Sequence, residues 1–213
     1  MKIGIRSPWQ AFAFWVAANF FITAAAAQDI RSVLRQTPNV EHGAALFRNC
    51  VSCHGADGLG APDGSVPIIA AQHSSVIAKQ LVDYRHAKRW DIRMERIADR
   101  HVLQDAQDVA DVAAYAAGLE RATRATTGDG AQSKEGAETY AQRCAGCHGA
   151  AGGGDPKKQV PRLATQHYDY LLRQMHDAAE GRRPNLSSAH KRLLKGFVME
   201  DFEGVADYLS QLH

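Results

Sequence analysis

The sequence predicts an all-α fold made of two tandem helical units. Three observations lead to this prediction. The pentapeptide pattern C-x-x-C-H occurs twice, at residues 50–54 and 144–148. The stretches that follow the two copies repeat each other without gaps. Elsewhere apolar residues recur at helical spacing, and no stretch alternates between apolar and polar residues as a half-buried strand does.

The repeat becomes visible when His148 is placed on His54, at an offset of 94. Many positions then coincide, including Gly55 and Gly149, Pro67 and Pro161, Gln72-His73 and Gln166-His167, Gln80 and Gln174, Asp83 and Asp177, and Arg89 and Arg183. An ungapped register of this length indicates a tandem duplication. We expect a first unit over residues 28–120, a linker rich in Thr, Gly and Ala over 121–133, and a second unit over 134–213.

Each unit is expected to contain helices in the same order. In the first unit, a helix begins near Asn39 and runs into the first C-x-x-C-H pattern, and a Gly- and Pro-rich loop follows over 55–67. Ser74 or Ser75 can cap the next helix, and a last helix is expected over 105–118. The second unit repeats this order with helices over 137–144, 167–180 and 199–212. Such small units bury little apolar surface by themselves, so a bound group must complete each core.

The C-x-x-C-H pattern is typical of covalent haem attachment. Both copies together use all four cysteines of the chain, Cys50, Cys53, Cys144 and Cys147, as thioether links. The adjacent His54 and His148 then become the proximal iron ligands. Zinc sites with two C-x-x-C pairs usually separate them by roughly 15–20 residues, and a thioredoxin-like centre needs no following histidine. The sequence therefore predicts two covalently bound haems c.

The N-terminal segment over 1–27 indicates export. Lys2 and Arg6 precede a mostly apolar stretch over 12–22, and an alanine run over 24–27 offers a cleavage site. We expect a cleaved signal peptide and a periplasmic protein; an uncleaved N-terminal anchor is the alternative. Loss of Lys2 and Arg6 lowers the formal charge from +2 to zero, and four haem propionates make the protein acidic. A nucleic-acid partner is therefore not expected, because such a partner needs a basic surface.

The two motifs, the segments over 67–80 and 161–174, and the closing stretches over 108–115 and 204–208 together make the chain similar to a di-haem class I cytochrome c of the c-four type. The resemblance covers nearly all of the mature chain. It implies two tandem cytochrome c domains that carry electrons between redox proteins in the periplasm, and no catalysis. It also implies that the carbonyls of Pro67 and Pro161 accept the Nδ1 protons of the proximal histidines.

The resemblance places the sixth ligand of the first haem at Met94, which follows His54 in the chain and lies between the second and last predicted helices. The histidine alternatives in this unit are His73, His86 and His101, of which His101 is the main one. His86 stands in a charged run and is expected on a solvated face.

The second unit departs from this pattern. Its distal position aligns with His190, which follows His148 at nearly the same interval as Met94 follows His54. The local pattern H-K-R-L-L at His190 also matches M-E-R-I-A at Met94. Met199, at the start of the last helix, is the alternative ligand. We therefore expect histidine–methionine ligation at the first haem and bis-histidine ligation at the second.

Unequal ligation has consequences for function. A methionine ligand raises the reduction potential of a haem, so the first haem is expected at the higher potential. A basic cluster near the second distal position forms either a solvated face or a docking patch for an acidic redox partner; its members are Arg182, Arg183, Lys191, Arg192 and Lys195. The alternatives to a pure carrier are a subunit bound to a membrane enzyme, and an enzyme with a labile distal ligand at the second haem that oxidises sulfur compounds or reduces peroxide.

Overall fold

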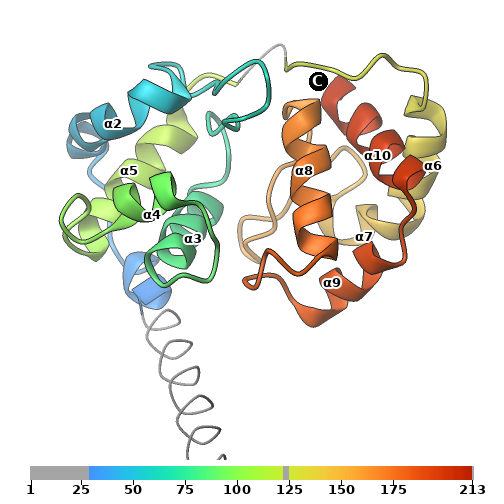
Figure 1. Cartoon of the computed structure of the whole chain (residues 1–213). Coiled ribbons are helices and arrows are strands. Elements are labelled where there is room, and N and C mark those ends of the chain that lie inside the picture. The colour runs from blue at the N-terminus through green and yellow to red at the C-terminus, as the bar shows by residue number, and fades with distance from the viewer. Residues whose placement is uncertain (1–28, 122–124, 213) are drawn as a thin grey trace, which may run out of the picture.

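The computed structural model describes residues 29–121 and 125–212, and it places them in two helical units that lie side by side (Figure 1). The first unit contains α2 (Val40–His54), α3 (Ser74–Arg85), α4 (Ile92–Ala98) and α5 (Ala106–Gly118). The second contains α6 (Ser133–Arg143), α7 (Ala145–His148), α8 (Tyr168–Ala179), α9 (Ser188–Lys195) and α10 (Met199–Gln211). The described residues form no strand beyond one isolated bridge between Asp155 and Val160. The predicted all-α class is confirmed.

Several helices begin at residues whose side chains accept hydrogen bonds from the first free backbone N–H groups. Asn39 caps α2, Asp91 caps α4, Asp105 caps α5 and Ser187 caps α9. These are the residue types that stabilise helix N-termini best. One predicted detail is wrong. The cap of α3 is His73, and Ser75 instead donates to the Pro156 carbonyl of the other unit.

In each unit the first and last helices cross at a glycine. A Cβ on Gly43 would lie 2.2 Å from the backbone oxygen of Asp111, and a Cβ on Gly136 would lie 1.8 Å from that of Gly204. Only a residue without a Cβ permits such backbone contact. Because α2 and α6 lead directly into the two C-x-x-C-H motifs, these crossings position the motifs on the cores.

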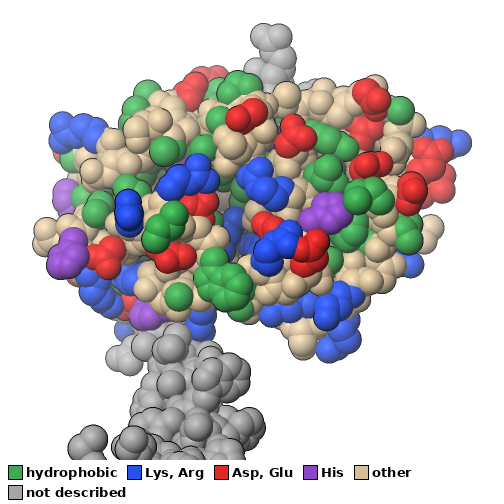
Figure 2. All heavy atoms as spheres, in the orientation of Figure 1, with side chains coloured by type: hydrophobic (Ala, Val, Ile, Leu, Met, Phe, Trp, Pro, Cys, Tyr) green, Lys and Arg blue, Asp and Glu red, His purple; other side chains and the backbone are tan. Residues whose placement is uncertain are grey.

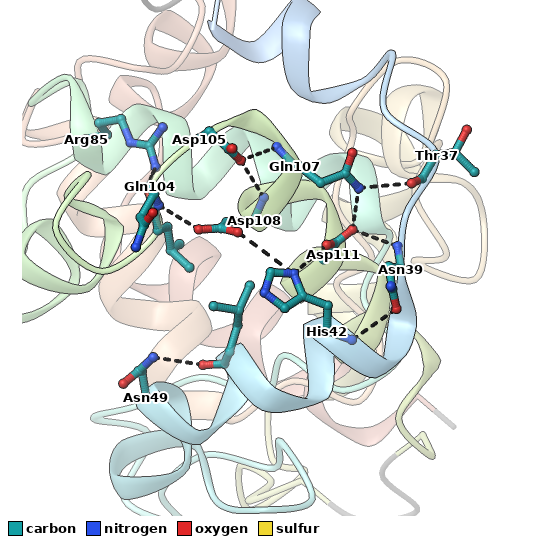
Figure 3. Close-up of polar contacts among 12 residues, drawn as sticks. Thr37, Asn39, His42, Asn49, Arg85, Gln104, Asp105, Gln107, Asp108 and Asp111 are labelled. Atoms are coloured by element: carbon teal, nitrogen blue, oxygen red, sulfur yellow. Dashed lines mark hydrogen bonds and ion pairs between the residues drawn. The ribbon is translucent and has the colours of Figure 1, made fainter.

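A buried carboxylate holds each crossing together. Asp111 on α5 accepts hydrogen bonds from the backbone N–H of Asn39 at 2.7 Å, from Gln107 at 2.7 Å and from the Nδ1 of His42 at 2.9 Å (Figure 3). Asp207 on α10 accepts from the backbone of Gly130 and Gln132 and from Gln211. Buried carboxylates need such donors because desolvated charge is otherwise costly.

The contact between the units is nearly two-fold symmetric. His73 donates through Nε2 to the carbonyl of Gly153 at 2.8 Å, and His167 donates through Nε2 to the carbonyl of Leu59 at 2.9 Å. The two bonds are equivalent in the repeat: His73 corresponds to His167, and Leu59 corresponds to Gly153, both at the offset of 94. The matched residues of the two repeats therefore mark the surface on which the two units meet.

The structure corrects two further expectations. The regions around Met94 and His190 are short helices, α4 and α9, where the sequence predicts loops. His86 is not on a solvated face, because its Nε2 lies 2.9 Å from Asp29 and its side chain is 18% exposed. Where it is described, the linker contacts the second unit, since the carbonyl of Thr126 accepts a hydrogen bond from the backbone of Tyr168.

None of the described helices has the length and apolarity to cross a membrane. The predicted signal peptide or anchor, over 1–27, lies outside the described residues.

Candidate haem sites

The proximal side is built in the same way in both units. His54 is at the C-terminal end of α2, and His148 ends α7. The Nδ1 of His54 donates to the carbonyl of Pro67 at 3.0 Å, and the Nδ1 of His148 donates to that of Pro161 at 3.1 Å. This is the contact that the sequence resemblance implies. It leaves Nε2 of each ring free to bind a metal, and it fixes the orientation of the ring.

The cysteines of the two motifs are also presented alike. Cys50 and Cys144 are half-buried against the cores of their units, whereas Cys53 and Cys147 are exposed. Burial raises the pKa of the Cys50 and Cys144 thiols to about 11. Each motif therefore presents one inner and one outer sulfur, which suits thioether links to two different edges of one bound haem. No cluster of three or more potential metal-ligating side chains occurs in residues 29–121 and 125–212.

In the second unit, His190 lies close to His148. Its ring faces that of His148, with 6.2 Å between ring centroids and 41° between ring planes. A metal–imidazole nitrogen bond is about 2 Å long, so two rings on opposite sides of one metal atom have centroids roughly 6 Å apart. Burial lowers the pKa of His190, and the nearby charges of His148 and Arg183 lower it further. A neutral imidazole of this kind is a competent metal ligand.

The alternative ligand of the second site is a solvent-exposed methionine. Met199 is the first residue of α10, and it is 51% exposed to solvent. Met175 packs against the core of the unit, as the sequence suggests.

In the first unit Met94 lies on α4 and packs, half-buried, against the core cluster that also contacts Cys50. Burial lowers the pKa of His54, and the charge of Arg93, the residue before Met94, lowers it further, so Arg93 lies near this histidine. α4 therefore lies beside the first motif. The side chain of His101 is 98% exposed and is 3.9 Å from Asp99. Of the two candidates in the first unit, only Met94 faces the interior.

Two arginines, one buried and one half-buried, lie at the contact between the units, and the sequence predicts no role for them in haem binding. Arg89 is 8% exposed and donates to Gln80 at 2.7 Å, to the hydroxyl of Tyr170 at 2.7 Å and to Gln174 at 2.6 Å. None of these acceptors is charged. The Nε of Arg183 is buried and has no partner among the described residues. Burial and the charge of Arg89 lower the pKa of Arg183 to about 10.

Buried cations are costly, and this arginine pair, on which the charges of Asp83 and Asp177 also act, is suited to hold a further anion between the units. The propionate carboxylates of a haem supply such a charge, and Arg89 and Arg183 would hold them. The residues present therefore fit the cofactor. Arg183 is consequently not part of the surface cluster in which the sequence analysis places it. In the sequence, Arg183 aligns with Arg89 at the repeat offset, and this alignment is the signal that could have indicated a shared role.

The comparisons with known proteins agree with this geometry. Residues 40–120 and 133–213 each match the family model described as cytochrome c. Cytochrome c4 of Thiocapsa roseopersicina is 32% identical over 176 residues, which cover 76% of this chain and 86% of the relative. A protein of Stutzerimonas stutzeri named thiosulfate dehydrogenase electron acceptor is 30% identical over 172 residues, with 76% and 78% covered.

Solved structures show the same relationship. Reduced cytochrome c4 from Pseudomonas stutzeri is similar with a TM-score of 0.73 and 27% identity, over 83% of this chain and all of that one. A thiosulfate dehydrogenase from Marichromatium purpuratum is similar with a TM-score of 0.69 and 26% identity, over 81% of this chain and 40% of that one.

Proposed function

Because this chain belongs to the cytochrome c family, as a di-haem member of the cytochrome c4 type that transfers electrons through two covalently bound haems c, we propose that it is a periplasmic carrier with unequal haem ligation. In this proposal the first haem has His54 and Met94 as axial ligands, and the second has His148 and His190. The observation that carries the proposal is the facing pair of His148 and His190, with ring centroids 6.2 Å apart.

Unequal ligation makes the carrier directional. The haems supply one-electron redox chemistry, and the chain sets their relative potentials through the residue at each distal position. A thioether raises the reduction potential, whereas a second imidazole does not. Electrons are therefore expected to enter at the second unit and to leave from the first.

The redox partner at the second unit is proposed to be acidic. Arg192 and Lys195 on α9 are exposed, and Lys191 beside them is half-exposed. Several basic side chains gather along the lower edge of the C-terminal unit (Figure 2). Charge complementarity of this kind speeds weak and transient encounters. Association with a membrane enzyme is compatible with the same surface.

The test compares variants of the two distal ligands in the full holoprotein. His190→Met is expected to raise the lower of the two reduction potentials and to leave the other in place. Met94→Ala is expected to remove the far-red absorption band of a ferric methionine-ligated haem. The exposed alternatives supply the controls: Met199→Leu and His101→Gln are expected to leave the spectra and both potentials unchanged. Two equal potentials in the unmodified protein, or a spectral change in Met199→Leu, would contradict the assignment.

A second candidate function is an enzyme whose second haem loses its distal ligand to a substrate. One observation favours it: within the described part of the chain no hydrogen bond to the His190 ring is recorded, whereas His148 is held by Pro161. Ligating histidines are usually fixed by such a bond. The similar solved structure of a thiosulfate dehydrogenase makes thiosulfate the first substrate to try. Rapid binding of carbon monoxide to the reduced second haem would favour this candidate over the carrier.

A further inference from the structure

The helix that carries Met94 is too short to be stable by itself. α4 has seven residues, of which only the last, Ala98, is buried. Isolated helices shorter than about 12 residues are marginal in water. α4 lies beside α3 (Figure 1). The position of Met94 therefore depends on the contacts that fasten α4 to the rest of the first unit.

Arg85, the last residue of α3, makes such a contact at the C-terminal end of α4. Its Nε donates to the carbonyl of Ala98 at 2.8 Å, and its Nη2 donates to the carbonyl of Leu103, in the turn after α4, at 2.7 Å. The last carbonyls of a helix have no partner within the helix, and a basic side chain is suited to them. The planar fork of a guanidinium allows one side chain to hold both carbonyls.

Asp29 supplies the counter-charge of Arg85. Its Oδ2 lies 3.5 Å from the Nη1 of Arg85, and it also accepts a hydrogen bond at 2.9 Å from Arg100, which follows α4. Burial raises the pKa of Asp29, but the hydrogen bond from His86 and the charge of Arg100 outweigh it, and the net pKa is lowered. The Asp29 carboxylate is therefore charged at neutral pH, and it holds the ends of α3 and α4 together.

The N-terminal end of α4 is held by Asp91, which accepts from the backbone N–H groups of Arg93 at 3.0 Å and Met94 at 3.4 Å. Met94 thus lies between two fastened ends. In the second unit α8 ends at Ala179, the repeat equivalent of Arg85 at the offset of 94. An alanine side chain has no donor to offer α9. The contact made by Arg85 therefore belongs to the first unit, where the distal residue is a methionine.

We propose that Arg85 is a positioning residue for Met94: it holds the C-terminal end of α4 and thereby keeps the thioether at the first haem. This inference rests on the proposed ligation of that haem by Met94. A thioether stabilises ferrous iron relative to ferric iron. The bond of Met94 to the ferric haem is therefore the one that depends most on how firmly α4 is held.

The test measures how readily imidazole displaces Met94 in the ferric holoprotein. The far-red absorption band of a methionine-ligated haem reports this displacement at the first haem alone. Arg85→Gln is expected to raise the imidazole affinity of that haem by about tenfold, the effect of losing one hydrogen bond from a charged group. Arg85→Lys keeps the charge but cannot hold both carbonyls, so a smaller increase is expected.

Arg96→Gln is the matched control, because Arg96 is an exposed arginine of α4 with no recorded partner among the described residues. It is expected to bind imidazole as the unmodified protein does. Equal imidazole affinities of the unmodified protein and both Arg85 variants would overturn the inference. An equal increase in Arg96→Gln and Arg85→Gln would also overturn it, because the effect would then be one of charge alone.

Two further measurements separate this inference from the proposed ligation and from a loss of folding. A far-red band that is absent from the unmodified protein, or that survives Met94→Ala, would refute the ligation and the inference with it. A band that is lost in Met94→Ala, with unchanged imidazole affinity in the Arg85 variants, would refute the inference alone. Helical circular dichroism reports whether each variant has folded. If Arg85→Gln does not fold, Arg85→Lys decides the question, because it retains the charge and most of the volume.

Discussion

The helix crossing at Gly136 offers the sharpest test of how the second haem site is positioned. A Cβ at this position would lie 1.8 Å from the carbonyl oxygen of Gly204, whereas real Cβ contacts essentially never fall below 3.0 Å. Gly136→Ala therefore forces α6 and α10 apart until this separation has grown from 1.8 Å to at least 3.0 Å. The obstructing atom is backbone, so no side-chain rotation can relieve the contact.

The expected cost follows from this geometry. Overpacking of a close contact destabilises a protein by about 3 kcal/mol at the upper end of the usual range. The better helix propensity of alanine returns about 1 kcal/mol. The net loss is thus about 2 kcal/mol, which lowers the urea midpoint of the second unit by roughly 1 M. Since α6 leads into Cys144, the displacement should also shift the potential of the second haem while the first haem keeps its own.

The assay is urea unfolding of the holoprotein, followed by circular dichroism and haem absorbance. Gly118→Ala is the matched control, because a Cβ there meets no atom within 4 Å. It is expected to leave stability unchanged or to raise it by up to about 1 kcal/mol. Equal midpoints for Gly136→Ala and Gly118→Ala would refute the claim that the close backbone approach holds the second motif in place.

Three further predictions concern the polar groups that support the crossings. Asp207→Asn should lower the unfolding free energy by about 2 kcal/mol in urea titrations, because a neutral amide accepts the same hydrogen bonds more weakly than a carboxylate. Burial raises the pKa of Asp111, but hydrogen bonds led by the backbone N–H of Asn39 outweigh it, and the net pKa is lowered. Asp111 thus contributes stability at pH values above its unfolded pKa of about 3.9, and this contribution is lost as the pH falls through the lower pKa of the folded state. Acid titration of Asp111→Asn should therefore show a shallower loss of stability below about pH 4 than the unmodified protein shows. Tyr140→Phe removes the hydroxyl that donates to the carbonyl of Gly149 at 2.6 Å, and should cost about 1–2 kcal/mol in thermal unfolding.

Short-range chemistry explains why much of this protein could be predicted from its sequence. The haem attachment motifs are local, since two cysteines and a histidine within one pentapeptide suffice to define them. The duplication is a comparison of the chain with itself, so it needs no structure. The short helices α4 and α9 escape prediction because each has at most eight residues, too few for a periodic apolar pattern to stand out.

The sequence by itself determined that this chain carries two covalent haems in duplicated helical units, because the attachment motif and the repeat register can both be recognised from consecutive residues. Only the tertiary structure decided what the other repeated residues do. Gln72, His73 and Arg89 meet partners that are far away in the sequence, across the contact between the units. Hydrogen bonds of these polar side chains are strong because they are shielded from water. That shielding depends on how the two units meet and not on any local sequence pattern.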